Sequence, residues 1–239
     1  MNNKISELFR TSLNSIALLI DPGKATLSDE FLKKINSSGI DYLFIGGSTA
    51  NRAQLNADIK KLKKHCEIPL IIFPGSPDQV SHHADAILFL SLISGRNPYY
   101  LIESQIEAAE EIYNSKIECI PTSYLLIDGL SESTVSIVSK TKPIPIENSK
   151  LIYKTALAGK LLGHSITYLE AGSGAKRSIP VEIVKKTSEL ETILIVGGGI
   201  KSIEQIKELH LAGANIVVIG NHIESNLEFL DKISRYKNL

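Results

Sequence analysis

The stretch that decides how this chain folds reads Tyr168-Leu169-Glu170-Ala171-Gly172-Ser173-Gly174-Ala175. It continues an apolar, β-branched run that begins at Ser165, so the pattern predicts a strand that ends in a tight turn. Glycine at positions 172 and 174 permits backbone angles that other residues avoid and lets a ligand approach the main chain closely. A plain strand followed by a flexible Gly/Ser turn is the alternative interpretation.

The same turn has the chemistry of an anion site. Successive backbone N–H groups can surround phosphate oxygens without any basic side chain, and Ser173 adds a hydroxyl donor. Glu170 would repel a phosphate, so this carboxylate is expected to bind something else, such as a hydroxyl group. A polyol phosphate would suit both halves of the stretch.

Length and composition limit the classes of protein that fit. The chain has 239 residues, which is typical of one α/β barrel, and 43% of them are hydrophobic, enough for a sizeable core. Its formal net charge is zero, so it lacks the basic footprint of a nucleic-acid-binding protein, and any anion site must be local. We find no linker, low-complexity tract or shift in composition, so the sequence predicts a single domain over residues 1–239.

The cysteines and the N-terminal residues indicate the compartment. Cys66 and Cys119 lie far apart without CxxC spacing, so they are interpreted as reduced, buried thiols of an intracellular protein. Residues 1–15 carry scattered charges and lack the apolar core of a signal peptide. No apolar run reaches the roughly 18–20 residues that a membrane span needs. We expect a soluble, cytoplasmic protein.

Apolar, β-branched runs alternate with helical patterns along most of the chain. Strands are predicted at residues 15–21, 42–47, 69–73, 86–93, 119–127, 166–170, 192–196 and 215–219. Helices are predicted at residues 28–39, 51–65, 101–114, 151–162, 181–190, 202–211 and 227–236. The interval 76–84 is too short for a full crossover helix and is expected to be a loop or a single turn, and the short run at 135–138 fits no one type.

Continuous apolar strands that alternate with helices imply a parallel sheet covered on both faces. Eight such units fit a (β/α)8 TIM barrel, and a doubly wound open sheet is the alternative. The active site of such a barrel lies at the carboxyl ends of the strands, and phosphate sites often use the loops after strands seven and eight. Glycine clusters occur at these predicted ends, at residues 46–47, 172–174, 197–199 and 220, which favours a phosphate site there.

Asp21 and Ser48 end the first two predicted strands, which are neighbours in a barrel. A carboxylate and a hydroxyl are hard oxygen ligands that suit Mg²⁺, which takes its other ligands from water and substrate phosphates. Spacing alone favours a structural role, in which Asp21 caps a turn before Pro22 and Ser48 caps the next helix. No residue pattern of a hydrolase is apparent.

Several ordered motifs together resemble the geranylgeranylglyceryl phosphate synthase family, which includes the related bacterial heptaprenylglyceryl phosphate synthases. The resemblance covers nearly the whole chain. It rests on residues 19–24 (LIDPGK), 45–49 (IGGST), 73–76 (FPGS), 91–100, 168–175, 196–200 and 220–221 (GN). The family is a modified TIM barrel in which an extended segment replaces the third helix, which agrees with the short interval at residues 76–84.

The resemblance implies a prenyltransferase that joins a polyprenyl diphosphate to sn-glycerol 1-phosphate, forms an ether bond and releases diphosphate, with Mg²⁺ as cofactor. Geranylgeranyl diphosphate is the expected donor. Mg²⁺ would be held by Asp21 and Ser48. Glycerol 1-phosphate would be held by Tyr168, Leu169, Glu170, Ala171, Gly172, Ser173, Gly174, Gly198, Gly199, Gly220 and Asn221.

The implied reaction gives roles to two carboxylates. Asp21 would act through Mg²⁺, which neutralises the charge that builds on the departing diphosphate. The glycerol hydroxyl attacks the allylic carbon and loses a proton, for which Glu170 is a hypothetical acceptor. Candidates for the apolar groove that holds the prenyl tail are Tyr99, Tyr100 and Ile102.

One departure from the family lies beside the expected tail groove. Glu103 stands where many relatives carry glycine, which bears on the tail region and the preferred chain length rather than on the chemistry. Many relatives are oligomers, so a homo-oligomer is expected, and a lipid product implies transient contact with a membrane surface. Two alternatives stay open: a non-catalytic phospholigand-binding barrel, and another phosphosugar TIM-barrel enzyme such as an isomerase or a flavin-dependent oxidoreductase.

Overall fold

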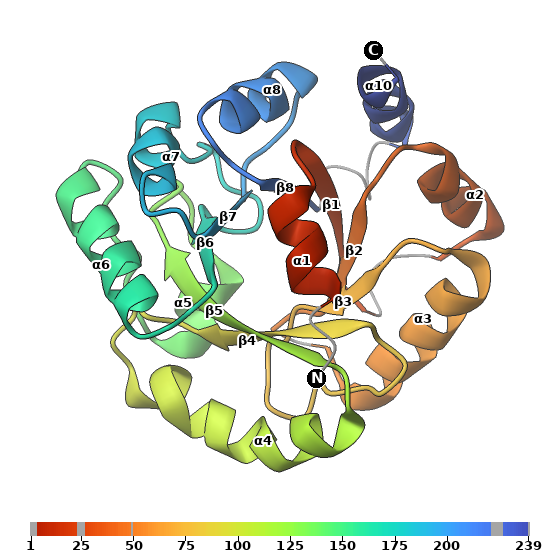
Figure 1. The fold of residues 1–239 in the computed structure, drawn as a ribbon, viewed down its shortest axis with the longest axis horizontal. Helices are drawn as coiled ribbons and strands as arrows, with labels where there is room; N and C mark the ends of the chain where they lie inside the picture. Colours follow the sequence, from red (N-terminus) through yellow and green to blue (C-terminus); the bar gives the residue numbers. More distant parts are fainter. Residues whose placement is uncertain (1–3, 23–26, 49, 221–226, 239) are drawn as a thin grey trace.

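The computed structural model describes residues 4–22, 27–48, 50–220 and 227–238, and its eight strands close into a parallel barrel surrounded by helices (Figure 1). The strands follow chain order around the barrel, and the last one pairs with the first. They are β1 Ser15–Ile20, β2 Tyr42–Ile45, β3 Leu70–Ile72, β4 Ala86–Ser91, β5 Glu118–Leu126, β6 Ile166–Glu170, β7 Ile193–Gly197 and β8 Ile216–Ile219. The predicted (β/α)8 barrel is confirmed, and the open sheet is excluded because its first and last strands would not pair.

The strands are apolar on both faces because one face packs inside the barrel and the other packs against the helices. Side chains alternate along a strand, so one set fills the barrel and the other packs under the helices. In β6, Tyr168 belongs to the cluster inside the barrel, whereas Leu169 belongs to the cluster beneath the helices. This alternation decides which residues of a strand end can reach a ligand.

The helices begin and end close to where the sequence signals place them. Side chains of Ser28, Asn51 and Ser202 accept hydrogen bonds from backbone N–H groups in the first turns of the helices that follow them. The helices are α1 Lys4–Thr11, α2 Asp29–Ser37, α3 Arg52–His65, α4 Ser104–Ser115, α5 Thr134–Ser139, α6 Ser149–Leu161, α7 Val181–Ser188, α8 Ile203–Leu211 and α10 Glu228–Lys237. A π-helix, η1, at Tyr99–Glu103 leads directly into α4, and the open question at 135–138 is answered by α5.

The connection from β3 to β4 has no helix. Residues 73–85, all of which the structure describes, pass through turns and extended backbone. This segment nevertheless contributes buried side chains, including Gln79 and Val80. The prediction that an extended segment replaces the third helix is therefore confirmed.

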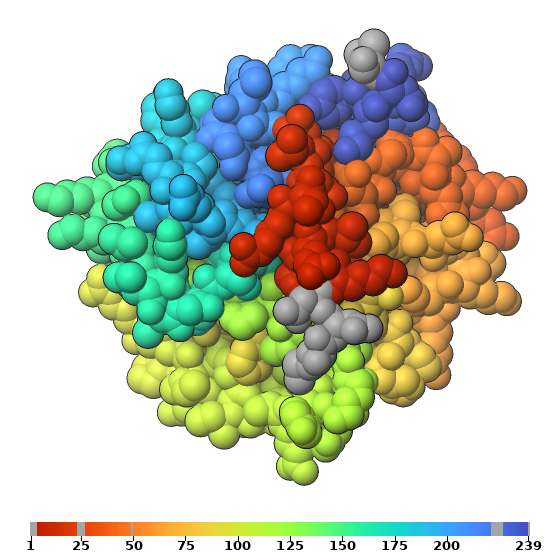
Figure 2. All heavy atoms as spheres, in the orientation of Figure 1, coloured from red at the N-terminus to blue at the C-terminus, as the bar shows by residue number. Residues whose placement is uncertain are grey.

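α1 was not predicted from the sequence; it covers the amino-terminal end of the barrel. Figure 2 shows its side chains lying across the middle of that face. Phe9 inserts among the barrel side chains, with its ring centroid 4.7 Å from that of Tyr42. Glu118 at the start of β5 accepts hydrogen bonds from the backbone N–H groups of Ile5 (2.7 Å) and Ser6 (2.9 Å), which fixes the first turn of α1. Site chemistry is thereby confined to the opposite end.

Two expectations about the chain as a whole are also tested. Both cysteines are free thiols, but only Cys66 is buried, and Cys119 is half-buried. Among the described residues, no helix combines the length and the apolar character needed to cross a bilayer.

Candidate active site

Two cavities open at the carboxyl ends of the strands, and they share a wall. The first has a volume of about 340 Å³ and is lined by strand ends from β1, β2, β6, β7 and β8. The second has a volume of about 130 Å³ and lies between the 73–80 segment, β4 and α4. Both are bounded by Gly47, Ser48, Phe73, Tyr124 and Val135. We name them the polar cavity and the apolar cavity.

Most residues predicted to bind the phosphate-bearing substrate line the polar cavity. They are Tyr168, Glu170, Gly172, Ser173, Gly174, Gly198, Gly199 and Gly220. Two predicted residues do not line it: Leu169 and Ala171 pack into the cluster beneath the helices, because side chains of a strand alternate. Asn221, together with the motif residues Gly23, Lys24 and Thr49, lies outside the described residues.

Glu170 is the titratable group at the centre of the polar cavity. Its side chain is 7% exposed, and its Oε1 accepts a hydrogen bond of 2.7 Å from the backbone N–H of Gly172. Burial raises the pKa of this carboxyl to about 7, and the Gly172 hydrogen bond and the Tyr168 hydroxyl only partly offset that rise. A group that titrates near neutral pH can both accept and release a proton under working conditions.

Glycine is required where β7 passes Glu170. A β-carbon at Gly198 would lie 2.5 Å from Glu170 Oε1, and the backbone there has a φ of +85°, which side chains rarely adopt. A β-carbon at Gly197 would lie 2.7 Å from both Glu170 Oε2 and the Tyr168 hydroxyl. The glycines after β7 therefore make room for the carboxylate as well as for a ligand.

Three aromatic rings pack together where the two cavities meet: Phe73 and Tyr124 line both cavities, and Tyr168 lines the polar cavity. The ring centroids of Phe73, Tyr124 and Tyr168 lie 5.2 to 5.7 Å from one another. Burial raises the pKa of both tyrosines well above the ordinary value, and the nearby Glu170 carboxylate raises it further. Both hydroxyls therefore stay protonated and can donate hydrogen bonds. Neither Phe73 nor Tyr124 was predicted to be a site residue, because each lies in an apolar run that also fits a core strand.

Asp21 and Ser48, the predicted metal ligands, both line the polar cavity. The carboxylate of Asp21 lies against the Gly47 backbone, so closely that a β-carbon at Gly47 would be 2.8 Å from Asp21 Oδ1. Among the described residues, no group of three or more His, Cys, Asp and Glu gathers as a complete metal site. A single carboxylate and a hydroxyl fit Mg²⁺, which keeps water and substrate oxygens as its other ligands.

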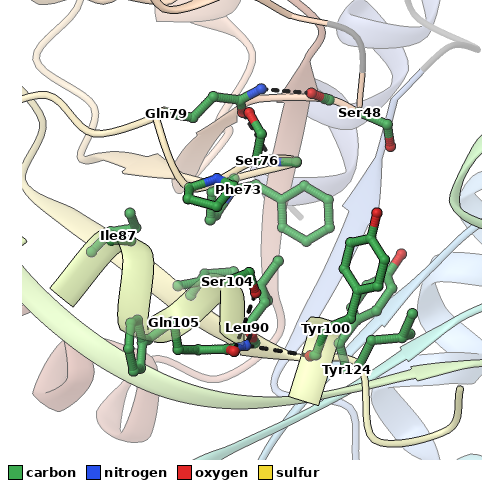
Figure 3. A pocket seen from close by; sticks show the side chains of 18 of the residues that line it. Ser48, Phe73, Ser76, Gln79, Ile87, Leu90, Tyr100, Ser104, Gln105 and Tyr124 are labelled. Atoms are coloured by element: carbon green, nitrogen blue, oxygen red, sulfur yellow. Dashed lines mark hydrogen bonds between the residues drawn. The ribbon is translucent and has the colours of Figure 1, made fainter. Parts of the chain in front are cut away.

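The apolar cavity lies where the prenyl groove was expected. Figure 3 shows Phe73 and Gln79 on one side of it and Gln105 and Tyr100 on another. Of the three tail-groove candidates, only Tyr100 lines the cavity; Tyr99 does not, and Ile102 is 55% exposed. All three candidates belong to η1, in which Tyr99 and Tyr100 are half-buried.

Further residues of the site were not predicted from the sequence. Lys201 and Thr134 line the polar cavity, and Val138 lines the apolar cavity. Lys201 follows the glycines after β7 and brings an exposed positive charge to the mouth of the polar cavity. A cation directly after a glycine-rich strand end was the signal that would have found it.

The fold and the two joined cavities at the carboxyl ends of the strands define a TIM-barrel enzyme. The model of the PcrB family matches residues 11–237 of the chain. The chain therefore belongs to the PcrB family.

Three similar proteins are each named as a geranylgeranylglyceryl phosphate synthase. The chain is 44% identical over 234 residues to a geranylgeranylglyceryl phosphate synthase of Flavobacterium johnsoniae, covering 97% of this chain and 96% of that protein. It is 40% identical over 227 residues to one of Korarchaeum cryptofilum, covering 93% and 92%. The crystal structure of (S)-3-O-geranylgeranylglyceryl phosphate synthase from Thermoplasma acidophilum in complex with sn-glycerol-1-phosphate superimposes with a TM-score of 0.87, at 32% identity, covering 97% of this chain and 94% of that one.

Proposed function

We propose that this chain joins a polyprenyl diphosphate to sn-glycerol 1-phosphate and releases diphosphate, with geranylgeranyl diphosphate as the donor. The observation that carries this function is the shared wall of the polar and the apolar cavity. A small phosphorylated polyol fits the first cavity and an apolar chain fits the second, so the two reacting carbon and oxygen atoms meet at the wall. Holding two substrates in this geometry removes much of the entropic barrier of the reaction.

Glycerol 1-phosphate binds in the polar cavity. The backbone turns at Gly172–Gly174 and Gly198–Gly199 surround its phosphate, in the manner of phosphate sites after the last strands of a barrel. Lys201 adds a positive charge to that end of the cavity. Glu170, buried beneath the turns, accepts hydrogen bonds from the glycerol hydroxyls, which explains why a carboxylate lies so close to an anion site.

Glu170 also accepts the proton that the attacking hydroxyl loses. The new carbon–oxygen bond forms at the allylic carbon while the bond from that carbon to the diphosphate oxygen breaks, and the electron pair leaves with the diphosphate. A carboxyl with a pKa of about 7 is ionised in a large share of molecules at neutral pH and is basic enough to take this proton. The Tyr168 hydroxyl lies beside it and helps to orient it.

Mg²⁺ would be held by Asp21 and Ser48, which line the polar cavity. When bound, it supplies positive charge to the diphosphate oxygens as that group leaves. Ser48 belongs to the shared wall, so a diphosphate at this point has its prenyl chain directed into the apolar cavity.

A turnover assay tests the function directly. Purified protein receives sn-glycerol 1-phosphate and geranylgeranyl diphosphate, with Mg²⁺ or with a chelator, and sn-glycerol 3-phosphate serves as the stereochemical control. We expect ether product that requires Mg²⁺ and prefers the 1-phosphate. A series of prenyl diphosphates from C10 to C35 then measures the chain-length preference.

The assay also separates the alternatives. Binding of glycerol 1-phosphate without product from any prenyl diphosphate would leave a non-catalytic phospholigand-binding barrel. An isomerase would act on glycerol 1-phosphate or a related sugar phosphate alone, and a flavin-dependent oxidoreductase would be purified as a yellow protein.

The assembly state is part of the same proposal. The barrel is a single prenyltransferase domain that works in the cytoplasm as a homo-oligomer and touches the membrane transiently to deliver its product. Two apolar side chains on the outer face of α4, Ile106 and Tyr113, are 66% and 62% exposed, which supports a contact between copies. Light scattering of Ile106→Glu should show a smaller species than the parent protein. The matched control is Leu211→Glu, on α8, where the leucine is 88% exposed.

A further inference from the structure

Gln79 is a fully buried glutamine in the segment that replaces the third helix. Its side chain has no exposed surface, although a glutamine buried in a protein interior must find partners for its amide group. It lies at the edge of the apolar cavity, beside the Gly47–Ser48 turn that the two cavities share (Figure 3). No motif in the sequence singles it out.

The amide group of Gln79 holds the turn after β2 from two sides. Its Nε2 donates to the carbonyl oxygen of Gly47 at 2.9 Å and to that of Ala50 at 2.8 Å. Its Oε1 accepts from the backbone N–H of Gly75 at 2.9 Å. The two donated bonds therefore span Ser48, and the accepted bond ties them to the turn after β3.

The two turns also pack backbone against backbone. A β-carbon at Gly75 would lie 2.3 Å from the Gly47 carbonyl oxygen and 2.6 Å from the Ser48 Cα. A β-carbon at Gly46 would lie 1.9 Å from the Phe73 carbonyl oxygen. Glycine at these positions allows the approach, and the Gln79 amide supplies the hydrogen bonds that hold it.

We propose that Gln79 is a positioning residue that sets the Gly47–Ser48 turn and thereby shapes the site for the diphosphate and its metal. This inference rests on the proposed function. Gln79 touches none of the reacting atoms; it acts through Ser48. Because Gln79 belongs to the segment that walls the apolar cavity, the position of the prenyl tail and the position of the diphosphate are set by one unit of structure.

A second glutamine in the same cavity provides a matched control. Gln105 on α4 is also buried, and its Nε2 donates to the carbonyl oxygens of Leu90 and Tyr100. Figure 3 shows it at the end of the cavity away from Ser48. Both side chains thus bond to backbone carbonyls inside one cavity, but only Gln79 bonds to the turn that carries Ser48.

The experiment compares Gln79→Met and Gln105→Met, which keep most of the side-chain volume and remove the amide. Each variant is saturated with sn-glycerol 1-phosphate and titrated with inorganic diphosphate and Mg²⁺ in a calorimeter. We expect Gln79→Met to bind Mg²⁺-diphosphate roughly tenfold more weakly while glycerol 1-phosphate binding changes by less than about twofold. Gln105→Met should bind Mg²⁺-diphosphate as the parent protein does.

Steady-state kinetics give an independent readout. Gln79→Met should raise the KM for the prenyl diphosphate and the Mg²⁺ concentration needed for half-maximal rate, with the KM for glycerol 1-phosphate unchanged. Gln105→Met should raise the KM only for donors with long prenyl chains. A general loss of structure would instead raise the KM values for both substrates together.

The outcomes distinguish this inference from the proposed function. Equal Mg²⁺-diphosphate affinity in Gln79→Met and the parent protein would overturn the positioning role. Failure of the parent protein to bind Mg²⁺-diphosphate at all would overturn the proposed metal and diphosphate site instead. If Gln79→Met does not fold, Gln79→Glu takes its place; it keeps the acceptor for Gly75 and loses donors to Gly47 and Ala50, so the same selective loss is expected.

Discussion

Two buried glutamates at opposite ends of the barrel have opposite surroundings. Glu118, at the amino-terminal end, is 6% exposed and accepts three hydrogen bonds, from the backbone N–H groups of Ile5 and Ser6 and from the Ser6 hydroxyl. Glu170, at the carboxyl end, is 7% exposed and accepts one backbone hydrogen bond, from Gly172. The two glutamates are thus buried to the same extent, but Glu118 accepts more hydrogen bonds than Glu170.

The difference shows that a carboxylate at one end of the barrel stabilises the fold, whereas a carboxylate at the other end is available for chemistry. A buried carboxylate that is fully hydrogen-bonded fixes structure, and here it fastens α1 across the end of the barrel. A buried carboxylate with fewer hydrogen-bond partners can still accept hydrogen bonds from a ligand, and its negative charge lowers the stability of the fold until the ligand binds. Amide substitution at the two positions should therefore act in opposite directions on stability.

The largest expected effect is on catalysis by Glu170→Gln. The variant has no carboxylate to accept the proton, so kcat/KM should fall by about 10²- to 10⁴-fold. The same change should stabilise the protein at pH 8 by roughly 2 to 3 kcal/mol, because the amide carries no charge that burial would desolvate.

The sign of that stability effect depends on pH. Burial raises the pKa of Glu170 from 4.5 to about 7, so between these values the folded protein holds a proton that the unfolded chain has released. Wild-type stability therefore falls as pH rises through this window, and the stability of the variant does not. Urea unfolding at pH 5 and pH 8 measures the difference. If the wild type and Glu170→Gln were equally stable at pH 8, burial of the ionised Glu170 carboxylate would not cost stability, and this prediction would be wrong.

The next largest effect is a loss of stability at the amino-terminal end of the barrel. Glu118→Gln places an amide nitrogen against donors and should lower the free energy of unfolding by roughly 3 kcal/mol. Kinetic constants of the folded variant should stay at parent values, because α1 lies away from both cavities. An altered KM for glycerol 1-phosphate would contradict the separation of the two ends.

A smaller effect concerns acid stability, again at the amino-terminal end. His210 Nε2 donates to the Ser15 carbonyl, and burial is the main cause that lowers the pKa of this histidine to about 4. Between pH 6.5 and 4 the unfolded chain gains a proton there and the folded protein does not, so stability falls as pH falls. We expect a loss of about 2 kcal/mol from pH 7 to pH 5. Unfolding of His210→Gln, which keeps a donor for Ser15, should lack this loss.

The smallest effect is expected from Tyr168→Phe. Contact with the Tyr168 hydroxyl lowers the pKa of Glu170, so its removal should shift the acidic limb of the pH profile of kcat/KM to higher pH. The rate at neutral pH should fall about 3- to 10-fold. An unshifted limb with a reduced maximum would instead assign Tyr168 a direct contact with the substrate.

The sequence was sufficient for the barrel and for most of the polar cavity. Continuous apolar strands, helix caps and glycines at the strand ends are local signals, so Tyr168, Glu170 and Gly198 could be singled out without a structure. The side chains of Leu169 and Ala171 face the cluster beneath the helices, because a run of adjacent residues alternates between the two faces of a strand.

Other features depend on residues far apart in the chain. The position of α1 is set by Glu118, more than one hundred residues away, although Ile5 and Phe9 already lie at helical spacing within its eight residues. Tyr124 and Phe73 join the site only because barrel closure brings rings from β5 and from the end of β3 into contact with Tyr168 of β6. The function of Gln79 follows from backbone contacts between two turns, which no spacing in the sequence encodes.

The triangle of Phe73, Tyr124 and Tyr168 has a consequence for the reaction. As the carbon–oxygen bond to diphosphate breaks, the allylic carbon acquires positive charge at the junction that these rings border. Aromatic faces carry partial negative charge and attract a cation. Rings at this junction would stabilise the developing charge without forming a bond to the carbon, while the glycerol oxygen attacks.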